Sequence, residues 1–497
     1  MTPEAYGALE ARFRRLSLLG EASRLLEWDC AALMPRRGAA ARAEQLTELT
    51  LIRHELLRDP ALVDLLDSAE NEVLDSWQSA NLATMRRRWQ HALAVSADLH
   101  EAETRAALAC ETAWREARPA NDFSGLAPLL TEVVRLAREV ATVKGEVLGC
   151  APYDALLDQW DAGLRVADFE DLFARLARDL PQLVATVVER QAAEAPPRLP
   201  NGPFAVADQQ RLAERLMAAV GFPAEHGRLD TSRHPFSCGT PEDLRITTRY
   251  NEDDFTSAIM AVLHETGHAL YDYGLPREWR YQPVGEALGM SIHESQSLII
   301  EMQACRGRAF MTFAAPLMRE AFGGEGEAWS ADNLYRLQAR VAPSLIRVDA
   351  DEVTYPLHIL LRTRLERLLI AGELEVPDLP GAWAEGMRDD LGIVPPDDRD
   401  GCLQDIHWGE GIFGYFPTYT LGAVTAAQLF QAARRTVPEL ETALGEGDFR
   451  PLLGWLGKNV HAHASSLDAR ALVTRATGRP LDADDFETHL KARYLAD

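Results

Sequence analysis

The sequence of 497 residues lacks any apolar run that approaches the ~18 residues needed by a membrane-spanning helix. The segment from Met1 to Arg15 also lacks the apolar core of a signal peptide, so export by that route is not supported. The six cysteines are scattered and form no Cys-x-x-Cys pair. These absences fit a reduced compartment, and we expect a cytoplasmic protein.

A basic excess is also missing, since the formal net charge is −25 at pH 7. Proteins that bind nucleic acid need a basic face, so a nucleic-acid partner is not expected, and nothing indicates a membrane partner. Because 47% of the residues are hydrophobic, the chain can bury a sizeable core.

Helical periodicity dominates the sequence to about residue 194. Apolar residues recur in alternating steps of four and three, as one buried helix stripe requires, for example at Leu129, Val133, Leu136, Val140 and Val143. Clustered proline and glycine at residues 195–203 then interrupt the pattern. We therefore expect one mainly α-helical unit over residues 1–497, with a subdomain break allowed near residues 195–205.

Residues 243–250 alternate between two faces, which predicts a half-buried strand. Asp243, Arg245 and Thr247 share its polar face. The strand leads directly into a predicted helix, and we expect its free edge to hydrogen-bond an extended peptide backbone. A small β-sheet is therefore expected beside the helical body.

The most informative stretch is His264-Glu265-Thr266-Gly267-His268. Two imidazoles four residues apart share one face of a helix and can bind one metal ion, and the glutamate between them is then the natural general base. A separate apolar stripe at helical spacing surrounds the motif: Phe255, Ile259, Val262, Leu263 and Leu270. We expect a helix that is capped at Asn251 or Asp253. Because so short a match also arises by chance, a third ligand is needed to distinguish a metal site from a chance match.

A catalytic zinc site takes three protein ligands and keeps one position open, and two histidines with one glutamate satisfy it. Residues 285–302 predict a second helix with Glu294 in its middle. The chain can turn back between the helices at Gly274, Pro276, Pro283 and Gly285. Two antiparallel helices would place Glu294 against the imidazoles, whereas the alternative is a solvated helix carboxylate.

These motifs resemble those of the carboxypeptidase Taq family of zinc metallocarboxypeptidases. The resemblance rests on His-Glu-Thr-Gly-His-Ala-Leu-Tyr at 264–271, Gly-Glu-Ala at 285–287 and Ile-His-Glu-Ser-Gln-Ser at 292–297. Further signatures are spread over nearly the whole chain, at residues 28–29, 34–35, 234–236, 243–247, 346–352 and 414–419.

The resemblance implies a large, saddle-like helical fold of the gluzincin type, with a deep central groove and a small β-sheet beside the zinc site. It implies one Zn²⁺ per chain, for which Co²⁺ can substitute, and a homodimer. The implied activity is a zinc-dependent metallocarboxypeptidase that acts on peptides with a free C-terminal carboxylate and releases single amino acids with broad specificity.

The expected chemistry places zinc on His264, His268 and Glu294, while Glu265 accepts a proton from water and passes it to the leaving amine. Asp272, four residues after His268, is either a residue that orients a ligand or an ordinary exposed helix charge.

A carboxypeptidase must recognise a free α-carboxylate, which suits the planar fork of an arginine. Arg347 is the first candidate and Arg245 the second. The alternative for either is a structural ion pair with an acidic residue nearby in sequence: Asp349, Asp351, Glu352 or Asp243.

Three further side chains are candidates for contact with the substrate. Tyr415 and Tyr419 flank Pro417, which predicts a loop, and their hydroxyls can donate to an oxyanion or to a carboxylate. His234 precedes a proline and is either such a donor or a wall of the groove. The alternative for the tyrosines is that they are packing aromatics.

Two other functions remain open. A zinc endopeptidase or dipeptidyl carboxypeptidase would share the metal ligands but leave the groove open or place the carboxylate anchor further away. A peptide-binding or scaffold protein would carry a decayed site, which the intact set of His264, Glu265, His268 and Glu294 argues against.

Overall fold

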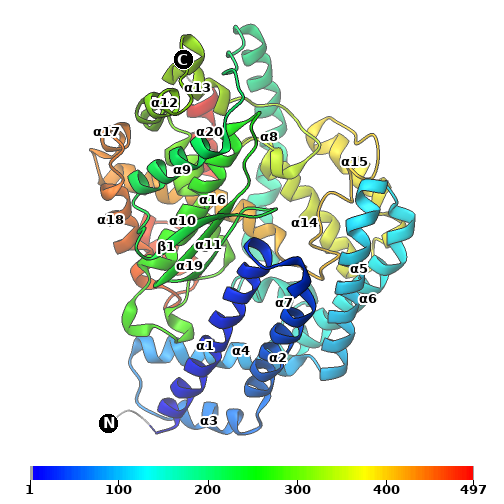
Figure 1. The fold of residues 1–497 in the computed structure, drawn as a ribbon. Coiled ribbons are helices and arrows are strands. Elements are labelled where there is room, and N and C mark those ends of the chain that lie inside the picture. The colour runs from blue at the N-terminus through cyan, green and yellow to red at the C-terminus, as the bar shows by residue number, and fades with distance from the viewer. Residues whose placement is uncertain (1–3, 496–497) are drawn as a thin grey trace. The chain divides into compact units, whose positions relative to one another are not determined.

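Helices make up most of the fold in the computed structural model, which describes residues 4–495 (Figure 1). The chain forms two compact units. The first unit comprises the residues up to Trp89, Pro197–Gln338 and Thr425–Leu481, and the second comprises Gln90–Pro196, Ala339–Val424 and the residues from Asp482 onward. The prediction of a mainly helical fold with a small sheet is confirmed, whereas the saddle shape and the single unit stay predictions.

The first unit holds the three-stranded sheet and many of the helices. Its elements are α1 (Glu4–Ala32), α2 (Ala39–Arg58), α3 (Ala61–Ala69), most of α4 (Ser76–Ala94), α9 (Val206–Val220), β1 (Gly227–Thr231), β2 (Phe236–Thr240), β3 (Asp243–Thr248), α10 (Phe255–Gly274), α11 (Met290–Leu298), the π-helix η4 (Ile299–Cys305), α12 (Arg308–Phe322), α13 (Ala331–Gln338), α17 (Leu440–Gly445), α18 (Arg450–Asn459) and α19 (Ala469–Thr477).

The second unit contains helices and connecting loops, with no strand among its described residues. Its elements are α5 (Ala97–Ala120), α6 (Phe123–Leu148), α7 (Pro152–Asp158), α8 (Val166–Ala193), the short 3₁₀ helix η6 (Arg347–Asp349), α14 (Tyr355–Ala371), α15 (Leu379–Leu391) and α20 (Asp484–Tyr494). Helix α16 (Phe416–Thr436) begins in this unit and ends in the first. No helix among residues 4–495 is long and apolar enough to cross a membrane.

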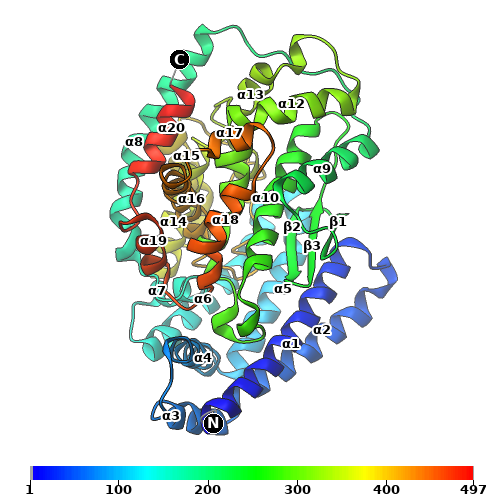
Figure 2. The same cartoon turned by 90° about the vertical axis from the view of Figure 1, so that its left-hand side faces the viewer.

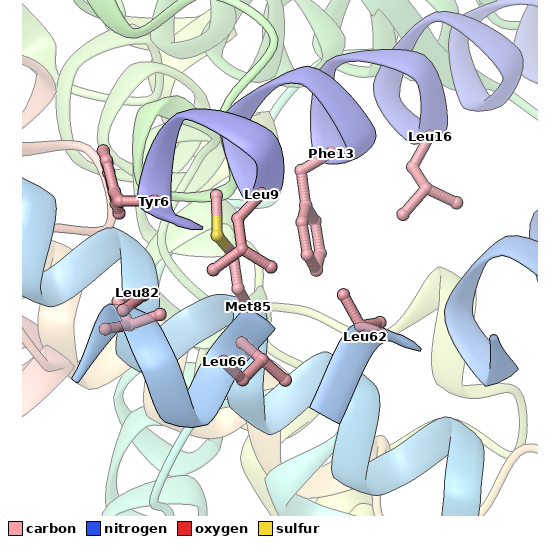
Figure 3. Packing of buried hydrophobic residues seen from close by; sticks show 9 residues of the cluster. Tyr6, Leu9, Phe13, Leu16, Leu62, Leu66, Leu82 and Met85 are labelled. Carbon is pink, nitrogen blue, oxygen red and sulfur yellow. The ribbon is translucent and has the colours of Figure 1, made fainter. Parts of the chain in front are cut away.

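A separate apolar core joins the N-terminal helices of the first unit. In Figure 3 the side chains of Leu9, Phe13 and Leu16 on α1 point toward leucines of α3 and toward Met85 of α4, and Tyr6 and Leu82 belong to the same cluster. The α1 residues recur in steps of three and four, so they lie on one face of the helix. Burial of this stripe explains why the N-terminal helices fold where the sequence predicts them.

The sheet has the strand order β1-β3-β2, with β1 parallel and β2 antiparallel to β3. Strand β3 is therefore central and both of its edges are already hydrogen-bonded, so the expectation of a free edge on residues 243–250 is wrong. The alternating pattern of one strand does not determine which strands pair with it. The sequence therefore could not predict the position of β3 within the sheet.

Helix α10, which carries the histidine motif, lies beside the sheet in the first unit (Figure 2). The Asp254 side chain caps it by accepting a hydrogen bond from the Thr256 backbone N–H at 2.9 Å. The predicted caps, Asn251 and Asp253, are therefore wrong. The helix is also buried on more than one side, because the sheet, α9 and α11 all pack against it.

Candidate metal centre and a buried arginine cluster

The three predicted metal ligands converge in the first unit. Ligand atoms of His264, His268 and Glu294 lie within 4.8 Å of one another, and this is the only such group of His, Cys, Asp and Glu residues found in the described part of the chain. Glu294 Oε2 lies 3.7 Å from His264 Nε2 and 3.4 Å from His268 Nε2. Ligands ~2.1 Å from a tetrahedral zinc ion stand about 3.4 Å apart, so the donor set fits zinc.

Gly267, within the histidine motif, allows this convergence. A Cβ atom at this position would lie 2.6 Å from the Gln296 carbonyl oxygen and 2.6 Å from Ser297 Cα, both on α11. The two helices therefore touch backbone to backbone beside the ligands, and α11 carries Glu294 to the imidazoles. Only glycine permits so close a contact.

Hydrogen bonds on the far side of each imidazole orient the two histidines. His264 Nδ1 lies 2.9 Å from Glu301 Oε2, and His268 Nδ1 lies 3.1 Å from the His293 carbonyl oxygen. With a proton on Nδ1, each ring presents the lone pair of Nε2 toward Glu294, as a metal ligand must. These two contacts therefore favour the tautomer of each ring that binds metal.

Sequence reasoning missed Glu301. It lies in the π-helix η4, where Arg306 also binds it at 2.6 Å. Its position seven residues after Glu294 was the available signal, because a residue two turns further along a helix lies on a similar face. π-Helical turns of this kind occur frequently at functional sites.

Asp272, the predicted orienting residue, contacts a neighbour of the ligands. Its Oδ1 lies 3.4 Å from His293 Nε2, and the His293 ring stacks on His268 with centroids 4.5 Å apart. Asp272 thus contacts a ring that stacks on His268, and its role as an orienting residue stays a prediction.

Electrostatics at the site favour a cation. Burial alone would lower the pKa of His264, but attraction to Glu294 and the hydrogen bond to Glu301 raise it to about 10. Burial would likewise raise the pKa of Glu294, but the two imidazoles lower it to about 2. Positive charge is therefore stabilised between His264 and Glu294, where a metal ion would replace the proton.

The predicted general base, Glu265, follows His264 on α10 and is buried.

Arg347 lies in a buried cluster of the second unit. Its Nε and Nη2 donate to Asp405 Oδ1 at 3.1 and 2.7 Å, and its guanidinium lies 5.2 Å from the Tyr419 ring centroid. Arg347 therefore forms an ion pair, as the sequence alternative allows, but its partner is Asp405 and not Asp349, Asp351 or Glu352. Asp349 is exposed, Asp351 binds the start of α14, and Glu352 pairs with His489 and Arg493.

A second arginine shares the same carboxylate. Arg362 Nε donates to Asp405 Oδ2 at 2.5 Å, Nη1 to the His358 carbonyl at 2.9 Å and Nη2 to Gln404 Oε1 at 2.7 Å. Burial would raise the pKa of Asp405, but the two guanidiniums hold it well below its usual range. The cluster thus has two guanidiniums for one carboxylate.

The other arginine candidate has a partner of its own. Arg245 donates through Nε and Nη2 to both oxygens of Asp243, at 3.0 and 2.9 Å, and stacks over Trp28 at 4.1 Å. This pair is one arginine with one carboxylate, as the structural alternative for Arg245 predicted. It leaves no excess of positive charge.

The remaining candidates lie in different places. His234 is exposed in the loop between β1 and β2 of the first unit. Tyr415 directly precedes α16 and Tyr419 lies in its first turn, where both are half-buried. The predicted loop around Pro417 is wrong, because a proline in the first turn of a helix loses no hydrogen bond. The Tyr419 hydroxyl lies 3.3 Å from His407 Nε2.

The sequence profile of the carboxypeptidase Taq (M32) metallopeptidases matches residues 8–494. Among curated proteins, the chain is 39% identical to thermostable carboxypeptidase 1 of Thermus thermophilus, over 100% of this chain and 99% of that protein. It is 33% identical to carboxypeptidase 1 of Bacillus subtilis, over 97% of this chain and 96% of that protein.

Solved structures agree with these matches. Metallocarboxypeptidase 1 of Trypanosoma cruzi superposes with a TM-score of 0.97 at 38% identity and covers 100% of both chains. The M32 carboxypeptidase of Deinococcus radiodurans superposes with a TM-score of 0.93 at 34% identity, over 99% of this chain and 98% of the other.

The close contact at Gly267 should be necessary for tight metal binding. Gly267→Ala should push α11 away from α10, and we expect at least about tenfold weaker metal binding together with a loss of stability of about 1–3 kcal/mol from overpacking. Chelator competition and thermal unfolding measure the two effects. Gly454→Ala on α18 is the matched control, because no atom lies within 4 Å of its Cβ position. Unchanged metal affinity in Gly267→Ala would contradict the role assigned to this contact.

Proposed function

We propose a mechanism for this chain, which belongs to the carboxypeptidase Taq (M32) family of metallopeptidases and is a metallocarboxypeptidase that releases C-terminal residues from peptides. His264, His268 and Glu294 hold one Zn²⁺ per chain, for which Co²⁺ can substitute. Glu265 is the general base, and Arg347 binds the α-carboxylate of the substrate. The excess positive charge around Arg347 is the observation that carries the carboxypeptidase specificity.

The metal proposal rests on the separations among the three ligand atoms and on the hydrogen bonds that hold both imidazoles. When bound, zinc polarises the scissile carbonyl and makes a coordinated water more acidic. Glu301 and the His293 carbonyl keep the two rings in place.

The position of Glu265 on α10 supports its assignment as the general base. It follows His264 on α10 and is 7% exposed, so its carboxylate lies in a largely water-free environment. We assign it two proton transfers: it accepts a proton from the attacking water and then gives that proton to the nitrogen of the leaving amino acid. No other role is assigned to it.

Arg347 is the better of the two arginine candidates for the substrate carboxylate. Its Nη1 has no hydrogen-bond partner among residues 4–495, whereas a guanidinium can donate five hydrogen bonds. Its charge is also only partly balanced, because Asp405 is shared with Arg362. Arg245 forms a neutral pair with Asp243 and lacks this excess. A peptide carboxylate would supply the missing negative charge.

The tyrosines and His234 are proposed to have secondary roles. Tyr419 packs against the Arg347 guanidinium, and Tyr415 packs against Tyr419 with ring centroids 5.2 Å apart. We assign both hydroxyls to donation toward the substrate carboxylate or the developing oxyanion. His234 is proposed as a further donor, a role supported only by the resemblance of its His-Pro-Phe segment to the family signature. The six free cysteines support a cytoplasmic location.

Removal of the general base should separate catalysis from metal binding. Glu265→Gln keeps the size of the side chain and all three ligands but loses the proton acceptor, so kcat should fall by at least ~10²-fold. Metal analysis should still give about one zinc ion per chain, whereas His264→Ala should lose the metal. Turnover near the unmutated level in Glu265→Gln would exclude Glu265 as the base.

A free C-terminal carboxylate should be required. A blocked dipeptide and its C-terminal amide should differ in kcat/KM by at least about 10²-fold, because a buried guanidinium without its partner costs more than one lost contact. Arg347→Met should shrink the difference mainly by raising KM of the acid. Equal rates on the acid and the amide in the unmutated enzyme would favour an endopeptidase instead.

We also propose a homodimer, which is supported by the family resemblance alone. Closed two-fold assemblies are the commonest state of soluble oligomers. Sedimentation velocity at low micromolar concentration should give a mass near twice the 55.1 kDa of the chain. A fully active monomer would refute the dimer and leave the assignment of the catalytic residues unchanged.

A further inference from the structure

We propose that Arg362 and Asp405 are positioning residues that set the orientation and the available charge of Arg347. The inference rests on the proposed function of Arg347 as the group that binds the substrate carboxylate. It adds that the binding strength is controlled by the balance of charge among three buried side chains, two of which never touch the substrate.

Asp405 is held from both sides. Its Oδ1 accepts from Arg347 and its Oδ2 accepts from Arg362, so each oxygen belongs to one guanidinium. Gln404 Oε1 strengthens the link, because it accepts from the Arg347 backbone N–H at 2.9 Å and from Arg362 Nη2 at 2.7 Å. The three charged groups therefore form one rigid unit in which Asp405 divides its charge between the two arginines.

The neighbouring groups do not neutralise the remaining positive charge. His358 and His407 face the cluster, and burial together with the two arginines lowers their pKa values to about 3 and about 4, so both are uncharged at neutral pH. Glu366, one turn after Arg362, accepts instead from Tyr153, Trp408 and the Gly414 N–H. The cluster keeps one more positive than negative charge.

Arg362 is unsuited to bind the substrate itself. It is fully buried, and each of its three nitrogens already donates to an acceptor of the second unit. Its guanidinium also lies 4.5 Å from the Trp383 ring centroid. Arg347 keeps Nη1 without a partner among the described residues. The structure thus divides the work: Arg362 engages Asp405, and Arg347 remains available to a second carboxylate.

A positioning role of Arg362 and Asp405 predicts a different effect of substitutions on carboxylate affinity than a purely structural role does. If Arg362 loses its charge, Asp405 neutralises Arg347 and the affinity for a carboxylate falls. If Asp405 also loses its charge, Arg347 regains its full charge. Charge balance predicts that the second substitution restores the acid preference lost in the first, because both act on Arg347 through the same carboxylate.

The experiment measures binding without turnover. In the Glu265→Gln holoenzyme, calorimetry gives the Kd of N-acetyl-Ala-Ala-Ala and of its C-terminal amide, and the ratio of the two defines the acid preference. The variants are Arg362→Met, Arg362→Lys, Asp405→Asn and the double variant Arg362→Met/Asp405→Asn. Arg364→Met is the matched control, because this arginine lies on the same helix but is 46% exposed and pairs with Asp390.

Arg362→Met should lower the acid preference at least about tenfold, as expected for the loss of a charge-assisted contact. Arg362→Lys should keep most of the acid preference, and Asp405→Asn should keep or increase it. The acid preference of the double variant should be higher than that of Arg362→Met. The control should not change it. A double variant no better than Arg362→Met, or a tenfold fall in Asp405→Asn, would overturn the inference.

The two proposals fail in different ways. Equal binding of the acid and the amide by the Glu265→Gln holoenzyme would refute the role of Arg347 itself. A clear acid preference that does not change with the charge at positions 362 and 405 would refute only the positioning role of Arg362 and Asp405. If Arg362→Met does not fold, Asp405→Asn still decides, because a tenfold fall of the acid preference in this variant alone overturns charge balance.

Discussion

The contact between α10 and α11 at Gly267 is the constraint on which the metal centre depends. The absence of a side chain there lets the two backbones meet, and Glu294 then reaches the imidazoles of the preceding helix. The same stretch of chain supplies the two groups that orient those imidazoles, the His293 carbonyl and Glu301. One helix contact thus places the third ligand and its supporting hydrogen bonds together.

Two buried clusters of charged side chains carry an uncompensated charge, and the sign of that charge indicates the ligand of each cluster. Around His264 lie the carboxylates of Glu294 and Glu301, of which Glu301 also pairs with Arg306, so a cation is favoured. Around Asp405 the surplus is positive, so a carboxylate is favoured. Buried charges without full compensation cost stability, and they are kept where a ligand completes them. A metal ion and the C-terminus of a peptide are the two ligands that a metallocarboxypeptidase requires.

Local patterns predicted what depends on local periodicity. The spacing of the histidines and the turn residues before α11 were enough to predict Glu294 as the third ligand. They were not enough for Glu301, because a helical spacing gives the face on which a residue lies but not the residue that it binds, nor for Asp405, which lies 58 residues from Arg347. Pro417 in a short segment predicts a loop, but proline is also common in the first turn of a helix, and local sequence does not distinguish the two. The paired edges of β3 depend on strands whose order no single strand encodes.

The central claim is that two imidazoles and one carboxylate of this chain hold the catalytic zinc. X-ray absorption at the zinc edge of the purified protein tests it most directly. A site of two imidazoles and one carboxylate should give outer-shell scattering from two imidazole rings and a first shell of nitrogen and oxygen at ~2.0–2.2 Å, with no sulfur. A sulfur scatterer at ~2.3 Å, or a number of imidazoles other than two, would contradict the claim.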